Sequence, residues 1–159
     1  MRFSICQLLF VGLLSAGAPA FAGDPSAAER QYRIARRLAA EGSSEAAAAL
    51  RKVVEVDPTG ELADDAIVEE ALLLHPPLWP EELGRLDETT AQRIIVLLTR
   101  VADGPVTGDR GAEARYLRGL MHLEPLPRYD ATAARVDLIA VATAPEISDW
   151  VSAARYAGA

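Results

Sequence analysis

From Gly23 onward the sequence is a series of alanine-rich, helix-forming segments separated by proline and glycine. Alanine supplies 26 of these 137 residues, and it has the highest intrinsic helix propensity of the amino acids. No segment shows the sustained alternation of apolar and polar residues, rich in β-branched side chains, that is typical of a strand. The sequence therefore predicts an all-α fold.

Capping residues and helix breakers divide this part of the chain into seven predicted helices. Ser26 and Glu29 match a capping box, Pro58 follows the end of the second helix, and Asp130 is placed to cap the sixth. Short connections predict antiparallel neighbours. The predicted helices run from Ser26 to Gly42, from the residue after a Ser43 or Ser44 cap to Val56, from Leu62 to Leu74, from Asp87 or Glu88 to Ala102, from Ala112 to Leu123, from Ala131 to Ala144, and from Pro145 or Glu146 to Tyr156.

Apolar residues at helical spacing predict which face of each helix is buried. In the first four helices these residues are Ile34, Ala35 and Leu38, then Ala46, Ala49, Leu50 and Val53, then Ala66, Ile67, Leu73 and Leu74, and finally Ile94, Ile95, Leu98 and Val101.

The first 22 residues have the three-part layout of a secretory signal. Arg2 precedes an apolar run from Leu8 to Leu14, and a segment rich in small residues follows and ends in Ala20-Phe21-Ala22. The run is shorter than the roughly 20 apolar residues that a membrane span requires. We expect cleavage after Ala22, which leaves residues 23–159 as one periplasmic or secreted domain without an integral membrane segment. An uncleaved anchor is the alternative.

The composition excludes several classes of function. A net charge of −7 argues against nucleic acid as a partner. The single cysteine, Cys6, lies in the predicted signal, and His75 and His122 are too far apart in sequence for a ligand pair at helical spacing. The sequence has no nucleophile elbow, P-loop or dinucleotide fingerprint. We therefore expect no catalytic residue, cofactor or metal site.

One helix pattern occurs twice. In each copy an alanine stands seven positions before a small apolar residue and twelve before a helix-ending proline. Repeated helical units of this kind indicate an α-solenoid, and small residues let neighbouring helices approach closely. The residues are Ala46, Val53 and Pro58 in the first copy and Ala133, Ala140 and Pro145 in the second.

These residues resemble the tetratricopeptide repeat family. The segment Glu45–Pro58 is similar to the repeat's second helix, with Ala46 at the signature small position and Leu50 at the usual aromatic position. A later pair carries Gly119 at the small position of its first helix and Asp137 where an aromatic is usual. The resemblance implies a right-handed α-solenoid of about three helix pairs plus a C-terminal capping helix. An irregular helical bundle is the alternative.

The resemblance also implies a binding groove lined by the first helix of each pair. The residues that would line it are Tyr32 and Arg36 in the first unit and Tyr116 and Leu120 in the third. The alternative is that both tyrosines pack between repeats. Trp79 lies in the proline-rich insert from His75 to Pro80, where it is either an exposed contact point or a cover for an apolar edge.

A row of basic residues marks the first helix. Arg30, Arg33 and Arg37 fall on one side of it and could bind an acidic partner or lipid head groups. The alternative is a solvated face whose charge is balanced by the acidic third helix.

Taken together, these features predict an exported helical-repeat protein that acts as a binding or scaffolding module in the bacterial cell envelope. It would recognise a peptide or helix of another protein in a groove between helix pairs. One alternative is a subunit of an oligomer that docks through its unpaired last helix, Glu146 to Tyr156. A small hydrolase is the least favoured alternative.

Overall fold

The computed structural model describes residues 26–75, 86–104, 109–123 and 129–144, which form six α-helices. No strand occurs in these ranges, so the predicted all-α fold is confirmed. The predicted signal, Trp79 and the predicted last helix lie outside the described residues. The helices are α2 (Ala27–Ala40), α3 (Ala46–Val56), α4 (Ala63–Leu74), α5 (Glu88–Ala102), α6 (Gly111–His122) and α7 (Ala131–Ala142).

Three helices begin at side-chain caps that the sequence predicted. Ser26 and Glu29 form the capping box of α2, where the Ser26 hydroxyl accepts a 3.1 Å hydrogen bond from the Glu29 amide. The Asp87 carboxylate accepts from the Thr90 amide at 2.9 Å and starts α5. Asp130 caps α7 in the same way. Each cap satisfies an amide that has no partner within the helix.

The start of α3 differs from the prediction. Its N-cap residue is Glu45, which makes no side-chain cap hydrogen bond, rather than Ser43 or Ser44. The Ser43 hydroxyl accepts from the Glu45 amide at 3.2 Å and so stabilises the preceding turn. That turn also contains Gly42 at a φ of +66°, a conformation that glycine adopts without strain.

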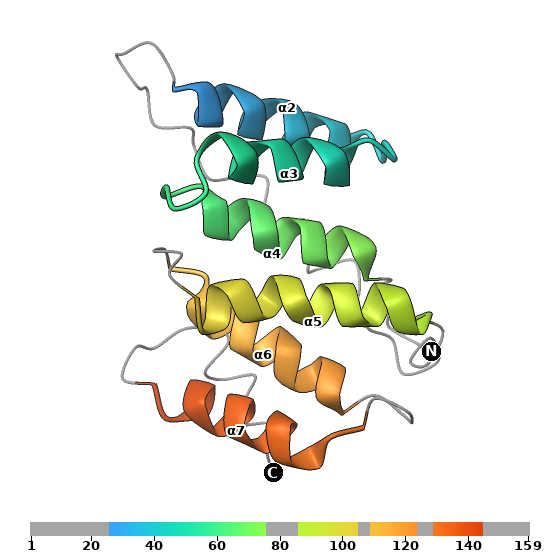
Figure 1. The fold of residues 1–159 in the computed structure, drawn as a ribbon, viewed down its shortest axis with the longest axis vertical. Coiled ribbons are helices and arrows are strands. Elements are labelled where there is room, and N and C mark those ends of the chain that lie inside the picture. Colours follow the sequence, from blue (N-terminus) through green and yellow to red (C-terminus); the bar gives the residue numbers. More distant parts are fainter. Residues whose placement is uncertain (1–25, 76–85, 105–108, 124–128, 145–159) are drawn as a thin grey trace, which may run out of the picture.

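The helices are arranged one after another in chain order, from α2 to α7 (Figure 1). Each helix packs mainly against the helix before it and the helix after it in the chain. This arrangement brings α2 against α3, the two helices of the first predicted pair, and α6 against α7.

A continuous apolar core runs through the array from α2 to α6. Leu50, Ile67 and Ile94 are among its most deeply buried side chains and come from three successive helices. A smaller apolar cluster, centred on Leu138 and Val141, attaches α7 to the rest. Tyr116 on α6 packs against both clusters, and therefore links the end of the array to the main core.

Two residues predicted to be on buried faces are exposed. Ile34 on α2 is 43 % exposed and Leu73 on α4 is 45 % exposed, so these predictions are wrong. On α4 the buried side chains include Val68 and Glu70 instead. Because α4 is apolar around most of its circumference and lies between two helices, its sequence does not identify one buried side.

Gly119 lies where α6 and α7 come closest. A Cβ atom at this position would lie 3.0 Å from Cγ of Leu138. The absence of a side chain therefore lets α7 pack directly on the backbone of α6, as expected for a small residue at a helix contact.

Candidate binding groove

A groove of about 320 Å³ lies between α3 and α5 and has α4 as its floor. The residues from α3 and the turn after it follow helical spacing, as do those from α5, so each set occupies one side of its helix. The lining residues are Arg51, Val54, Glu55 and Pro58 on one wall, Ile67 and Glu70 in the floor, and Arg93, Leu97 and Arg100 on the other wall.

Glu70 connects the two walls of the groove. Its Oε1 atom accepts a 2.7 Å hydrogen bond from Nη1 of Arg51 on α3 and a 2.5 Å bond from Nη2 of Arg93 on α5. The Glu70 side chain is 2 % exposed. A buried carboxylate is stable only when it is paired, so this network fixes both guanidinium groups in relation to the floor.

A third arginine lies along the same wall as Arg93. Arg100 follows Arg93 by seven residues, or about two helical turns, and both line the groove. Within the described ranges, no carboxylate forms an ion pair with Arg100. The groove therefore combines an apolar surface with three guanidinium groups, one of which has no ion-pair partner there.

Tyr32 and Arg36, two of the residues predicted to line a groove, meet at Glu69 of α4. The Tyr32 hydroxyl donates a 2.7 Å hydrogen bond to Glu69, and Nε of Arg36 lies 3.8 Å from the same oxygen. Burial and the charge of Glu69 raise the pKa of the Tyr32 phenol, which stays protonated as a donor. These residues thus tie α2 to α4.

The other two predicted groove residues, Tyr116 and Leu120, lie on α6 and are half-buried. Tyr116 packs into the core, and burial raises the pKa of its phenol. In the array, α3, α4 and α5 stand between α2 and α6 (Figure 1). The structure joins Tyr32 to Arg36 through Glu69 and places Tyr116 and Leu120 separately from them.

The basic helix α2 and the acidic helix α4 are joined by the ion pair between Arg36 and Glu69. Arg33 and Arg37 are exposed, and Nε of Arg37 lies 3.8 Å from Oε1 of Glu41, the C-cap residue of the same helix. Of the acidic residues of α4, Glu69 pairs with Arg36 of α2, whereas Asp65 pairs with Arg110 and Glu70 pairs with Arg51 and Arg93.

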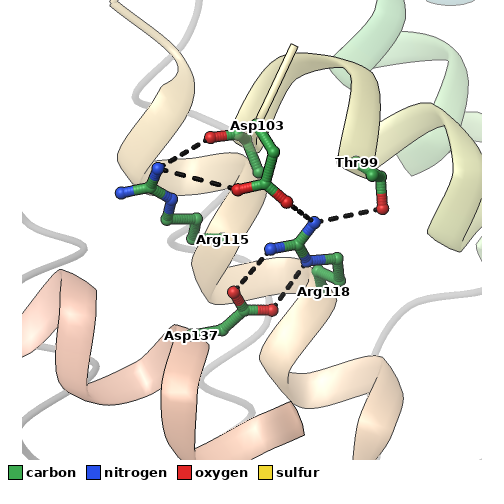
Figure 2. Close-up of polar contacts among 6 residues, drawn as sticks. Thr99, Asp103, Arg115, Arg118 and Asp137 are labelled. Atoms are coloured by element: carbon green, nitrogen blue, oxygen red, sulfur yellow. Dashed lines mark hydrogen bonds and ion pairs between the residues drawn. The ribbon is translucent and has the colours of Figure 1, made fainter.

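A separate charged cluster joins α5, α6 and α7 (Figure 2). Arg118 donates two hydrogen bonds to the carboxylate of Asp137, at 2.7 and 2.6 Å, and others to Asp103 and Thr99, at 2.5 and 3.1 Å. Hydrogen bonds from Arg118 lower the pKa of Asp103. Arg118 on α6 already bonds three acceptor residues, Thr99 and Asp103 of α5 and its C-cap and Asp137 of α7, so this cluster is structural rather than an open site.

A second cluster joins α6 to α4. Arg110 donates a 2.8 Å hydrogen bond to Asp65, its backbone amide donates to Asp64 at 3.2 Å, and its Nε forms an ion pair with Glu113. Burial raises the pKa values of Asp65 and Glu113, while Arg110 opposes the rise. The guanidinium of Arg110 therefore pairs with two carboxylates, those of Asp65 and Glu113.

The groove between α3 and α5 was not identified from the sequence. One signal was present, because Glu70 is a charged residue inside an apolar helical run. Another was the spacing of Arg93, Leu97 and Arg100, which places them on one side of a helix. Neither signal reveals that Glu70 and Arg93 meet.

Among the described residues, no three His, Cys, Asp or Glu side chains form a group that could hold a metal ion. None of the described helices is long and apolar enough to span a membrane. Comparison of the chain with protein-family models, curated proteins and solved structures gives no match.

Proposed function

We propose that this protein is an exported helical-repeat protein that binds a segment of another protein and acts as a scaffold in the bacterial cell envelope. The groove between α3 and α5 is the observation that carries this proposal. It exposes apolar side chains beside guanidinium groups, and such combinations are typical of protein contacts. The proposed role is binding, without catalysis.

Neighbour-to-neighbour packing supports the further proposal that the helices form tetratricopeptide-like pairs in a right-handed solenoid. Ala46, at the signature small position of a second helix, is 2 % exposed, and Gly119, at the small position of a later first helix, adjoins Leu138 closely. Repeat proteins bury their core through contacts between successive units in this way.

Export is proposed from the sequence of residues 1–22, which has the layout of a signal peptide cleaved after Ala22. The proposed location is the periplasm or the medium. N-terminal sequencing of the mature protein tests this step, since a first residue other than Gly23 contradicts the proposed cleavage site.

Site-specific photo-crosslinking in the source cells tests the binding role. A benzophenone amino acid replaces Glu55, an exposed residue at the groove, and in a matched control it replaces Arg33, an exposed residue of α2 outside the groove. We expect a discrete crosslinked protein from position 55 and none from position 33. Equal products from both positions, or no product from position 55, contradict the proposed groove.

The second candidate function is that of an oligomer subunit, and a feature of α7 favours it. Val136 and Ile139 on this helix are 64 % and 49 % exposed, which leaves an apolar surface at the end of the described array. The predicted docking helix, Glu146 to Tyr156, lies outside the described residues. Light scattering of the full mature protein over a range of concentrations separates the candidates, because an oligomer subunit associates as concentration rises.

A further inference from the structure

The groove between α3 and α5 carries more positive than negative charge, although the whole chain has a net charge of −7. Its lining contains three arginines, Arg51, Arg93 and Arg100, and two carboxylates, Glu55 and Glu70. The groove therefore has a local excess of positive charge, opposite in sign to the net charge of the chain.

The two wall arginines that bond Glu70 retain hydrogen-bonding capacity. Arg51 and Arg93 each donate one hydrogen bond to Oε1 of Glu70, and their side chains are 42 % and 44 % exposed. A guanidinium group has five N–H donors, so each keeps donors that a ligand can reach. Because Glu70 already holds both groups, a ligand does not have to order them on binding.

The remaining surface of the groove is apolar. Val54 and Ile67 are buried side chains of α3 and α4, and Leu97 and Pro58 complete the lining. A volume of about 320 Å³ is at the small end of the range of ligand pockets, and accommodates one or two side chains rather than a folded surface.

We propose that this groove binds an acidic segment of a partner protein, with side-chain carboxylates on Arg51, Arg93 and Arg100 and a neighbouring apolar side chain on Pro58 and Leu97. Guanidinium groups bind carboxylates with two parallel hydrogen bonds, and the apolar contact places that carboxylate. This inference rests on the proposed binding function and specifies the partner's chemistry. We favour a peptide over an anionic membrane because the positive charge is confined to a narrow groove in a negatively charged chain.

The test uses the full mature chain and a matched pair of peptides. The probe is the N-acetylated, C-amidated hexapeptide Ala-Leu-Glu-Glu-Leu-Ala, and its partner has Gln in place of both Glu residues. Amidation removes the terminal carboxylate, so any acid preference comes from side chains. We expect the Glu peptide to shift the Nε–Hε NMR signals of Arg51, Arg93 and Arg100, and the Gln peptide to bind about tenfold more weakly.

Matched charge-removing variants show whether the arginines are responsible. Arg100→Gln is expected to weaken binding of the Glu peptide about tenfold. The fold is expected to survive, because Arg100 is exposed and forms no ion pair within the described part of the chain. Arg33→Gln removes the same charge from an exposed site on α2 and is expected to leave the affinity unchanged. Equal losses in both variants overturn the proposal, since they indicate a general charge effect.

The other outcomes separate this inference from the proposed function. If both peptides bind the groove equally well, or neither binds it, the acidic specificity is overturned, whereas the crosslink from position 55 still decides whether the groove binds a protein. The last experiment measures binding of the protein to phosphatidylglycerol vesicles. If they bind the protein in an Arg100-dependent manner and the Glu peptide does not, the ligand is a membrane and the proposal is wrong.

Discussion

Arg118 and Asp137 form a two-point ion pair between α6 and α7, with Nε to Oδ2 at 2.7 Å and Nη2 to Oδ1 at 2.6 Å. Asp137 is 6 % exposed in its side chain, so its charge is almost fully removed from water. Both carboxylate oxygens are paired, which offsets the cost of burying the group. The pair therefore fixes how the last described helix sits on the array.

Replacement of Asp137 by alanine should destabilise the protein by about 3 kcal/mol, because it leaves Arg118 largely buried without its main partner. Urea unfolding followed by circular dichroism measures the change. Glu41→Ala is the control, since the Glu41–Arg37 pair is exposed and should contribute no more than about 1 kcal/mol. Similar losses in the two variants would contradict a special role for the buried pair.

Substitution of Gly119 by valine should destabilise the contact between α6 and α7 by about 2 kcal/mol, because its side chain would overlap Leu138. Gly111→Val is the matched control, as a Cβ at Gly111 meets no atom within 4 Å. Thermal or urea unfolding of the two variants gives the comparison. If Gly119→Val is as stable as Gly111→Val, the close approach is not needed for folding.

The stability contributed by Glu113 should decrease as pH rises. Burial raises the pKa of this carboxyl in the folded state above its unfolded value of 4.5, against the opposing effect of Arg110. The folded state therefore binds the proton more tightly, and the contribution is complete below the unfolded pKa and is lost as pH rises through the folded pKa. The free energy of unfolding of the wild type minus that of Glu113→Gln, measured from about pH 3 to about pH 7, gives this slope.

The contribution of Asp103 should have the opposite sign. Hydrogen bonding from Arg118 lowers the pKa of Asp103 below its unfolded value of 3.8, so its contribution is present above pH 3.8 and is lost as pH falls through the folded pKa. Asp103→Asn, measured over the same range, provides the comparison. If the contributions of Glu113 and Asp103 to the free energy of unfolding change with pH in the same direction, the pKa of one of these two carboxyls is shifted in the opposite direction.

Removal of the Ser26 hydroxyl should destabilise α2. Ser26→Ala deletes the side chain that accepts from the Glu29 amide, at a cost of about 1 kcal/mol. Ser44→Ala makes the same chemical change at an exposed residue that forms no cap hydrogen bond, and should be close to neutral. Equal losses of stability in Ser26→Ala and Ser44→Ala would contradict a stabilising role of the Ser26 cap.

The helix starts could be predicted because they depend on neighbouring residues. Ser26, Asp87 and Asp130 each bond to an amide two or three residues further on, so the signal is contained in a short stretch of sequence. Ser44 has the same chemistry but does not cap α3, which begins after Glu45. A local pattern thus gave the region of that helix but not its first residue.

The buried faces were harder to predict, because burial depends on where the neighbouring helices lie. Leu73 of α4 is exposed although it is strongly apolar, whereas Asp64 and Glu70 on the same helix are buried. Both carboxylates are compensated by groups remote in sequence, Asp64 by the amide of Arg110 and Glu70 by two arginines. Such compensation is visible only once the helices are packed.

The groove residues could not be predicted for the same reason. Arg51 and Arg93 lie 19 and 23 positions from Glu70, on the helices before and after it, and no local pattern joins them. The predicted residues Tyr32 and Arg36 do meet, but at Glu69, the neighbour of Glu70 in sequence. Glu69 and Glu70 thus contact different helices, because successive residues of a helix point about 100° apart.

The packing of each helix mainly on its two neighbours in the chain has a mechanical consequence. A slight tilt at one helix contact is passed on to every helix beyond it, so small rotations add up along the array. We therefore expect the distance between α2 and α7 to depend on the sum of these small rotations rather than on any single helix contact.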